Sequence, residues 1–271
     1  LLLLPSSSFF FLLLPSSLSI YHIIYSYNNI SALEPDVLQG LGGTLVRVGL
    51  SSNQLTSLPA TVFDNLPQLE RIGLRHNLLQ ALAPGTFAGC PNLEFLFLNG
   101  NLLTALDPHI FGGLTQLKVL DLSDNLITEF AVGTFNGLVN MQYLSLGGNL
   151  LTTLPIGIFD TVFTAAASQG VQDWYYMGDA YVFELSRQPL VVNLTHSSHL
   201  QRLDYTVFLA LPALVNVYIT ADASDQINLG SCCGLEWLSN PSVEVIYAPQ
   251  TLVALATTPP ITNKKKERKE K

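Results

Sequence analysis

The chain has 271 residues, of which 48% are hydrophobic and only 12% are charged, a composition that argues against disorder and favours a buried core. Residues 264–271 hold six basic and two acidic residues, a net of +4, so the total charge of −8 leaves −12 on the preceding chain, which argues against nucleic-acid binding. The three cysteines are too few for a disulfide scaffold.

Residues 1–19 form an apolar, low-complexity segment. They consist of Leu, Pro, Ser and Phe alone, and no charged residue precedes Glu34. The run Phe9–Leu14 is consistent with the remains of a signal-peptide hydrophobic region, and an upstream low-complexity extension is the alternative. Because Pro5, Pro15 and several serines interrupt the segment, a transmembrane span is not expected.

From Leu45 to Thr164 the chain falls into five units of 24 residues without gaps. Counted from the start of each unit, positions one, four, six and eleven are apolar, position nine is asparagine and position nineteen is phenylalanine. The two most regular columns are Asn53, Asn77, Asn101, Asn125 and Asn149, and Phe63, Phe87, Phe111, Phe135 and Phe159. A fixed period of this length predicts a solenoid of stacked units.

Each position of the unit has a physical reason. Positions four and six lie on one face of a short strand, and positions three, five and seven lie on the other. Stacking the units makes a parallel sheet and merges the apolar positions into one core. The asparagine amide both donates and accepts, so we expect it to bond turn groups of its own unit and the next. The phenylalanine column is expected to pack the convex side.

These units match LxxLxLxxNxLxxLxxxxFxxLxx and resemble leucine-rich repeats of the 24-residue class. The segments LTSLPATVFDNL and LTTLPIGIFD resemble repeats of Toll-like receptor ectodomains, Slit-type proteins and variable lymphocyte receptors. The resemblance implies an α/β solenoid, a right-handed superhelix with a parallel β-sheet on the concave face and a mostly irregular or short helical convex face. It also implies an extracellular protein that binds protein or glycan.

Weaker units flank the regular ones. Residues 20–44 fit the template with one extra residue, so six repeats are expected over 20–164. Residues 165–189 are either a degenerate repeat or an insertion. In a degenerate repeat, positions one, four, six, nine and eleven would be Val171, Trp174, Tyr176, Asp179 and Tyr181, with aspartate in place of asparagine. Residues 190–230 are expected to form degenerate repeats, with a strand starting at Leu214.

The last part of the chain is expected to close the solenoid. Residues 231–262 contain SCCGLEWLSNP, which resembles the C-terminal cap of extracellular leucine-rich-repeat proteins. Leu235, Trp237 and Leu238 would cover the last repeat. Cys232 and Cys233 are adjacent and do not reproduce the CxC spacing of that cap, so their disulfide state is left open. Residues 263–271 form a basic tail, expected to be solvated.

No catalytic constellation stands out, and no metal or cofactor is expected. Gly40–Thr44 reads GLGGT but lacks the lysine of a phosphate-binding loop, so we expect an irregular turn between repeats. His196 and His199 do not combine with Cys232 and Cys233 at a usual zinc spacing. Cys90 occupies a position where other units have leucine, which predicts a buried core thiol.

The outward side chains of the strands, at positions three, five and seven, form the concave face. Their register predicts that aromatic and charged residues gather on neighbouring strands, with Lys118 beside them. The expected ligand-binding patch consists of Arg71, Arg75, Phe95, Phe97, Asp121 and Tyr143. Exposed aromatic and arginine side chains are the usual anchors of an interface, and ordinary solvent-facing strand residues are the alternative.

Asn29 and Asn193 lie in glycosylation sequons, NIS and NLT, and Asn193 lies close to an expected strand. The sequence therefore favours a non-enzymatic recognition module, extracellular or at the cell surface, with a protein or glycan ligand. A cytoplasmic scaffold or regulatory subunit with the same fold is the alternative, and an enzyme built into residues 165–263 is a third. Nucleic-acid binding and membrane attachment are not expected, and the sequence does not indicate an oligomeric state.

Overall fold

The computed structural model describes residues 9–10, 22–159, 191–194, 215–218 and 243–246. Short strands alternate here with turns, and the described residues contain no helix. The strands are β1 (Phe9–Phe10), β2 (His22–Ile24), β3 (Ala32–Leu33), β4 (Arg47–Gly49), β5 (Arg71–Gly73), β6 (Phe95–Phe97), β7 (Val119–Asp121), β8 (Tyr143–Ser145), β9 (Val191–Asn193), β10 (Val215–Tyr218) and β11 (Val243–Ile246).

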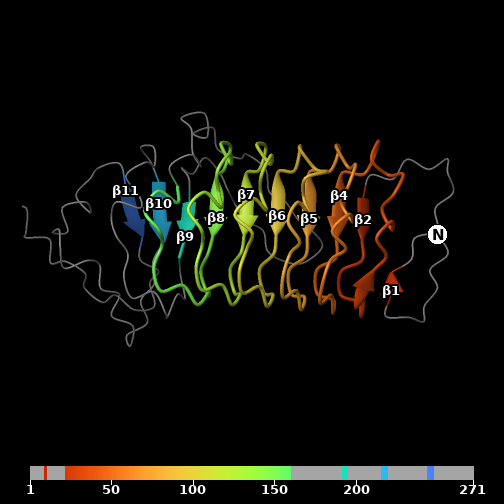
Figure 1. Ribbon diagram of the computed structural model, residues 1–271, viewed down its shortest axis with the longest axis horizontal. Coiled ribbons are helices and arrows are strands. Elements are labelled where there is room, and N and C mark those ends of the chain that lie inside the picture. The colour runs from red at the N-terminus through yellow and green to blue at the C-terminus, as the bar shows by residue number, and fades with distance from the viewer. Residues whose placement is uncertain (1–8, 11–21, 160–190, 195–214, 219–242, 247–271) are drawn as a thin grey trace, which may run out of the picture.

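Nine of these strands form one parallel sheet in the order β11-β10-β9-β8-β7-β6-β5-β4-β2. They lie side by side in a row along the long axis of the molecule, as Figure 1 shows. From β4 to β8 each strand pairs with the next at the same position of the 24-residue unit, for example Val48 with Ile72 and Ile72 with Leu96. The predicted solenoid is therefore confirmed, with turns on the side away from the sheet.

The core forms as the repeat predicts. The leucines, isoleucines, valines and methionine at positions one, four, six and eleven are buried in one continuous cluster. The five phenylalanines at position nineteen are fully buried. Phe63 stacks on Phe87 with ring centroids 5.9 Å apart, and Phe135 lies 6.2 Å from Phe111 and 6.3 Å from Phe159. Since burying a phenylalanine contributes about 1.5–3 kcal/mol, this column is a main source of stability.

Asparagines at position nine tie the units together, as Asn101 illustrates. Its Oδ1 accepts a hydrogen bond from the backbone N–H of Leu79 at 3.1 Å. Its Nδ2 donates to the carbonyl of Leu74 at 3.0 Å and to that of Leu98 at 2.9 Å. Leu74 and Leu79 belong to the preceding unit, so the expected bond to the next unit is wrong. The backbone groups of each turn are instead hydrogen-bonded by the asparagine of the unit that follows it.

The residue before each asparagine has a left-handed backbone. The six residues in this column are Tyr27, Ser52, His76, Gly100, Asp124 and Gly148, with φ between 53° and 67°. A Cβ built on Gly100 would lie 2.5 Å from Nδ1 of His76, so the imidazole covers this glycine. Asp124 covers Gly148 in the same way. The column thus fixes His76 and Asp124, both exposed, along one border of the concave face.

The strands at both ends of the regular array join the same sheet. His22 of β2 pairs with Arg47 of β4, 25 residues later, which accommodates the extra residue of the first unit. Tyr143 of β8 pairs directly with Val191 of β9, 48 residues later. Residues 165–189, expected to form a degenerate repeat or an insertion, lie outside the described residues. The strand expected from Leu214 corresponds to β10.

Two further expectations fall on described residues. Gly40–Thr44 lies in turns, as expected. Cys90 is fully buried, and its Sγ donates to the carbonyl of Phe63 at 3.3 Å, so it is the predicted core thiol. Cys232 and Cys233 of the proposed cap, the pair His196 and His199, and the basic tail lie outside the described residues. Of the cap range 231–262, β11 (Val243–Ile246) is the part that the structure describes.

Candidate functional site

The register places the expected patch on neighbouring strands. Position three runs through His22, Arg47, Arg71, Phe95, Val119 and Tyr143, which are partners in consecutive strand pairs. At position five, Gly73 pairs with Phe97 and Phe97 pairs with Asp121. Since parallel strands lie about 4.8 Å apart, side chains at the same position are in reach of one another. The six predicted residues therefore gather over β5 to β8.

Arg71 and Phe95 make the central contact of the patch. The guanidinium carbon of Arg71 lies 4.5 Å from the centroid of the Phe95 ring, a cation–π arrangement. Both side chains are buried, with 3% and 2% of their surface exposed. The expectation that Phe95 is an exposed anchor is thus wrong in this respect. Large side chains at the same register position of neighbouring strands cover each other, and the sequence pattern alone does not show this.

Asp121 is also buried, on the other side of Phe97. Its Oδ1 accepts hydrogen bonds from the backbone N–H of Ser123 at 3.0 Å and from the Ser123 hydroxyl at 2.6 Å. Burial raises the pKa of Asp121 above its usual value, and the negative charge of Asp124 acts in the same direction. The hydrogen bonds from Ser123 and Ser145 oppose this shift. This carboxylate is held in a fixed position by its neighbours.

The remaining patch residues, Arg75, Phe97 and Tyr143, are partly exposed. The patch therefore has two layers. Arg71 and Phe95, which contact each other, and Asp121, which is held by Ser123, are buried, and the other three side chains reach solvent beside them. A surface built on locked side chains loses little conformational freedom on binding.

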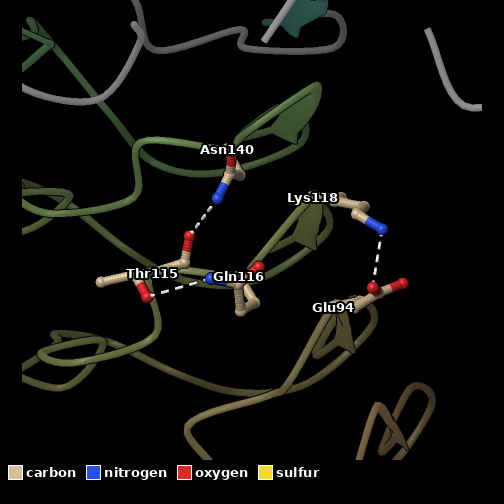
Figure 2. Close-up of polar contacts among 5 residues, drawn as sticks. All are labelled: Glu94, Thr115, Gln116, Lys118 and Asn140. Carbon is tan, nitrogen blue, oxygen red and sulfur yellow. Dashed lines mark hydrogen bonds and ion pairs between the residues drawn. The ribbon is translucent and has the colours of Figure 1, made fainter. Parts of the chain in front are cut away.

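Lys118 lies beside this patch, as the sequence predicted, but its charge is already engaged. Its Nζ lies 2.6 Å from Oε1 of Glu94, and Figure 2 shows the two side chains pointing toward each other from neighbouring units. In the same view Asn140 donates from Nδ2 to the backbone carbonyl of Thr115 at 2.8 Å. This border of the sheet is therefore held by polar contacts between successive units.

The sequence reasoning did not extend the concave face into the first unit. Extending position three into the first unit gives His22, next to Arg47. His22 is exposed and Arg47 is partly exposed. Ile24 and Tyr27, from the same unit, expose 52% and 64% of their surface. The template had already assigned residues 20–44 to a repeat, so the same column count would have found them.

The two sequon asparagines have different surroundings. Asn29 is exposed, and its Oδ1 accepts a hydrogen bond from Nε2 of Gln54 at 3.1 Å. Asn193 ends β9, and its backbone pairs with Ser145 on one side and Tyr218 on the other. Asn29, which does not lie in a paired strand, is therefore the more accessible of the two as a glycosylation site.

The described residues contain no cluster of three or more His, Cys, Asp or Glu side chains that would hold a metal ion. Within the same part of the chain, no helix has the length and apolar character needed to cross a bilayer.

Comparison with known proteins gives a consistent picture. The leucine rich repeat family model matches residues 43–103 and 96–151. No curated protein matches the chain, whereas 189 chains of solved structures do. One is from the structure of the Toll–Spatzle complex, described as a molecular hub in Drosophila development and innate immunity, in its glycosylated form. It is 23% identical with a TM-score of 0.52, and the match covers 70% of this chain and 22% of that chain. The chain thus spans about a fifth of that structure's length, and the likeness shows the fold.

Proposed function

Since this chain is a leucine-rich-repeat protein, a fold typical of protein-binding modules, we propose that it is a non-enzymatic recognition module that binds a partner on its concave face. The ligand-binding patch consists of Arg71, Arg75, Phe95, Phe97, Asp121 and Tyr143. Of the two ligand classes, protein and glycan, we favour a protein.

The contact of Arg71 with Phe95 carries this proposal. It locks a buried arginine and a buried aromatic ring together as a rigid base for the partly exposed side chains beside it. Phe97 and Tyr143 then supply partly exposed aromatic surface on either side of β7. A partner that covers them removes water from an arrangement that needs no further ordering.

We further propose that the protein acts outside the cell or at its surface. The exposed sequon at Asn29 and the resemblance of the repeats to Toll-like receptor ectodomains support this location. The solved Toll structure is described as glycosylated and in complex with Spatzle, which concerns that protein. The alternative is a cytoplasmic scaffold. A mobility shift after glycosidase treatment of protein from its native source supports the first, and an unshifted band together with reduced thiols supports the second.

Photo-crosslinking tests the binding face directly. Benzoylphenylalanine replaces Tyr143 on the concave face in one variant and Val132 in another, and both are incubated with extract from the native source. Val132 is the matched control because it lies in a turn away from the sheet and exposes 63% of its surface. We expect a discrete protein adduct from position 143 and none from position 132. The same adduct from both positions, or from position 132 only, contradicts the proposal.

A further inference from the structure

Two asparagines of the chain, Asn99 and Asn136, directly precede a glycine. In such a pair the backbone nitrogen of the glycine can attack the side-chain carbonyl carbon of the asparagine, because glycine has no Cβ that hinders the approach. A carbon–nitrogen bond forms, the side-chain amide leaves as ammonia with the proton of the glycine N–H, and a cyclic succinimide results. Water then opens the ring to aspartate or to isoaspartate, whose backbone runs through the former side chain. The reaction therefore needs a glycine nitrogen that is not held elsewhere.

The first pair is held by the units on both sides of it. The carbonyl of Asn99 accepts a hydrogen bond from the N–H of His76 at 2.9 Å, and the N–H of Gly100 donates to the carbonyl of Ser123 at 3.0 Å. The imidazole of His76 also covers Gly100, since a Cβ there would lie 2.5 Å from Nδ1. The nitrogen of Gly100 can attack the side chain of Asn99 only after its bond to Ser123 breaks, so the fold slows the reaction at this pair.

The second pair lies in an exposed turn on the side away from the sheet. Asn136 is exposed, and among the described residues the N–H of Gly137 donates no hydrogen bond. A Cβ built on Gly137 would meet nothing within 4 Å, so the space beside this glycine is open. Its φ is 84°, in a region that glycine enters and leaves without steric hindrance. The hydrogen bond that restrains the nitrogen of Gly100 therefore has no counterpart at Gly137 in this part of the chain.

We propose that Asn136 is a site of spontaneous deamidation in the folded chain, with the nitrogen of Gly137 as the nucleophile and water as the second reactant, and that Asn99 is protected. The two pairs have the same covalent chemistry and differ because one glycine N–H is bonded to the next unit and the other is not. The modification adds a negative charge to the turn side of the solenoid, and it does not involve the binding face of the proposed function.

The two products have different consequences for the fold. Aspartate at position 136 would match Asp64, which occupies the same position of its unit and donates its backbone N–H to the carbonyl three residues earlier, as Asn136 does. Isoaspartate instead lengthens the backbone between Phe135 and Leu138, which are both fully buried. The added methylene must displace one of these side chains or break the 3.3 Å hydrogen bond from the N–H of Leu138 to the carbonyl of Phe135. Because a close-packed core does not absorb such a shift, isoaspartate should lower the stability of the chain.

The test follows deamidation of the folded full chain during incubation at neutral pH. Mass spectrometry of proteolytic peptides detects the mass gained when OH replaces NH2 at each position, and electron-transfer fragmentation distinguishes isoaspartate from aspartate. We expect Asn136 to react at least about tenfold faster than Asn99, because Gly100 must first lose a hydrogen bond. In concentrated urea, where the fold no longer restrains Gly100, the two rates should differ by less than about twofold.

Asn136→Ala is the matched control for the effect on stability, because the second unit carries alanine, Ala88, at the same position. Urea unfolding before and after the incubation measures both chains. The unfolding midpoint of the original chain should fall as isoaspartate accumulates, whereas the midpoint of Asn136→Ala should stay constant.

Three results would overturn the inference. Equal rates at Asn99 and Asn136 in the folded chain would show that the hydrogen bond of Gly100 does not decide where the modification occurs. Deamidation of Asn136 in urea but not in the folded chain would show that the turn is protected. If Asn136 forms isoaspartate and the midpoint falls no more than that of Asn136→Ala, the predicted effect on the fold is wrong.

Discussion

Replacing Asn101 with alanine tests how the solenoid is held together. The change removes an acceptor for the N–H of Leu79 and a donor to the carbonyls of Leu74 and Leu98, all buried. A buried N–H left without a partner costs about 1–3 kcal/mol, and each lost bond to a carbonyl adds about 1 kcal/mol. The expected loss is therefore about 3–5 kcal/mol, a large part of the 5–15 kcal/mol by which domains are usually stable.

Asn99→Ala is the matched control, two residues away. Asn99 is partly exposed, and its Oδ1 has no hydrogen-bond partner among the described residues, so its loss should cost about 0.5 kcal/mol or less. Urea unfolding followed by far-UV circular dichroism measures both variants. Similar midpoints for Asn101→Ala and Asn99→Ala would refute the idea that the buried amide ladder links the units.

Three further predictions concern separate features of the fold. Gly100→Ala should destabilise the chain by about 1–3 kcal/mol in the same unfolding assay, because φ is 67° and the new Cβ would lie 2.5 Å from His76 Nδ1. Gly43→Ala, where a Cβ meets nothing within 4 Å, is the control, and an equal loss would count against this reasoning. Asp121→Asn should raise the thermal midpoint at pH 7, because burial raises the pKa of Asp121 and the ionised form therefore destabilises the folded state. This penalty is absent below the ordinary pKa of 3.8, so the gain should vanish near pH 3, and a gain that is constant from pH 3 to pH 7 would contradict it. Burial raises the pKa of Cys90 to about 12, so iodoacetamide should label its tryptic peptide only after unfolding; labelling of the folded chain at the rate of an exposed thiol would show that the site is open.

The periodic core was predictable because burial decides it. A column such as Phe63 to Phe159 repeats only if every unit places it in the same buried site, so a single sequence suffices to identify it. The direction of the asparagine bonds was not predictable, since the amide's chemistry allows partners in either neighbouring unit. Asn101 bonds backward because the turn of the preceding unit lies within its reach.

The composition of the patch followed from the register, but its exposure did not. Counting positions placed Arg71 beside Phe95, and the strand pairing agrees. Whether two neighbouring side chains are exposed to solvent or cover each other depends on their conformations, and the 24-residue repeat does not determine these. The direct pairing of β8 with β9 was not predictable either, because the regular pattern of 24-residue units ends at Thr164.

The proposed binding face is tested most directly by measuring affinity for the protein captured at position 143. Phe97→Ser removes a partly exposed aromatic ring from the patch, while Phe95 is left in place because it is buried and its loss would disturb the fold. Ile156→Ser is the control, since Ile156 exposes 61% of its surface in a turn away from the sheet. We expect Phe97→Ser to weaken binding about tenfold, or about 1.4 kcal/mol, and Ile156→Ser to leave it unchanged. Unchanged affinity in Phe97→Ser, or an equal loss in Ile156→Ser, would contradict recognition by the concave face.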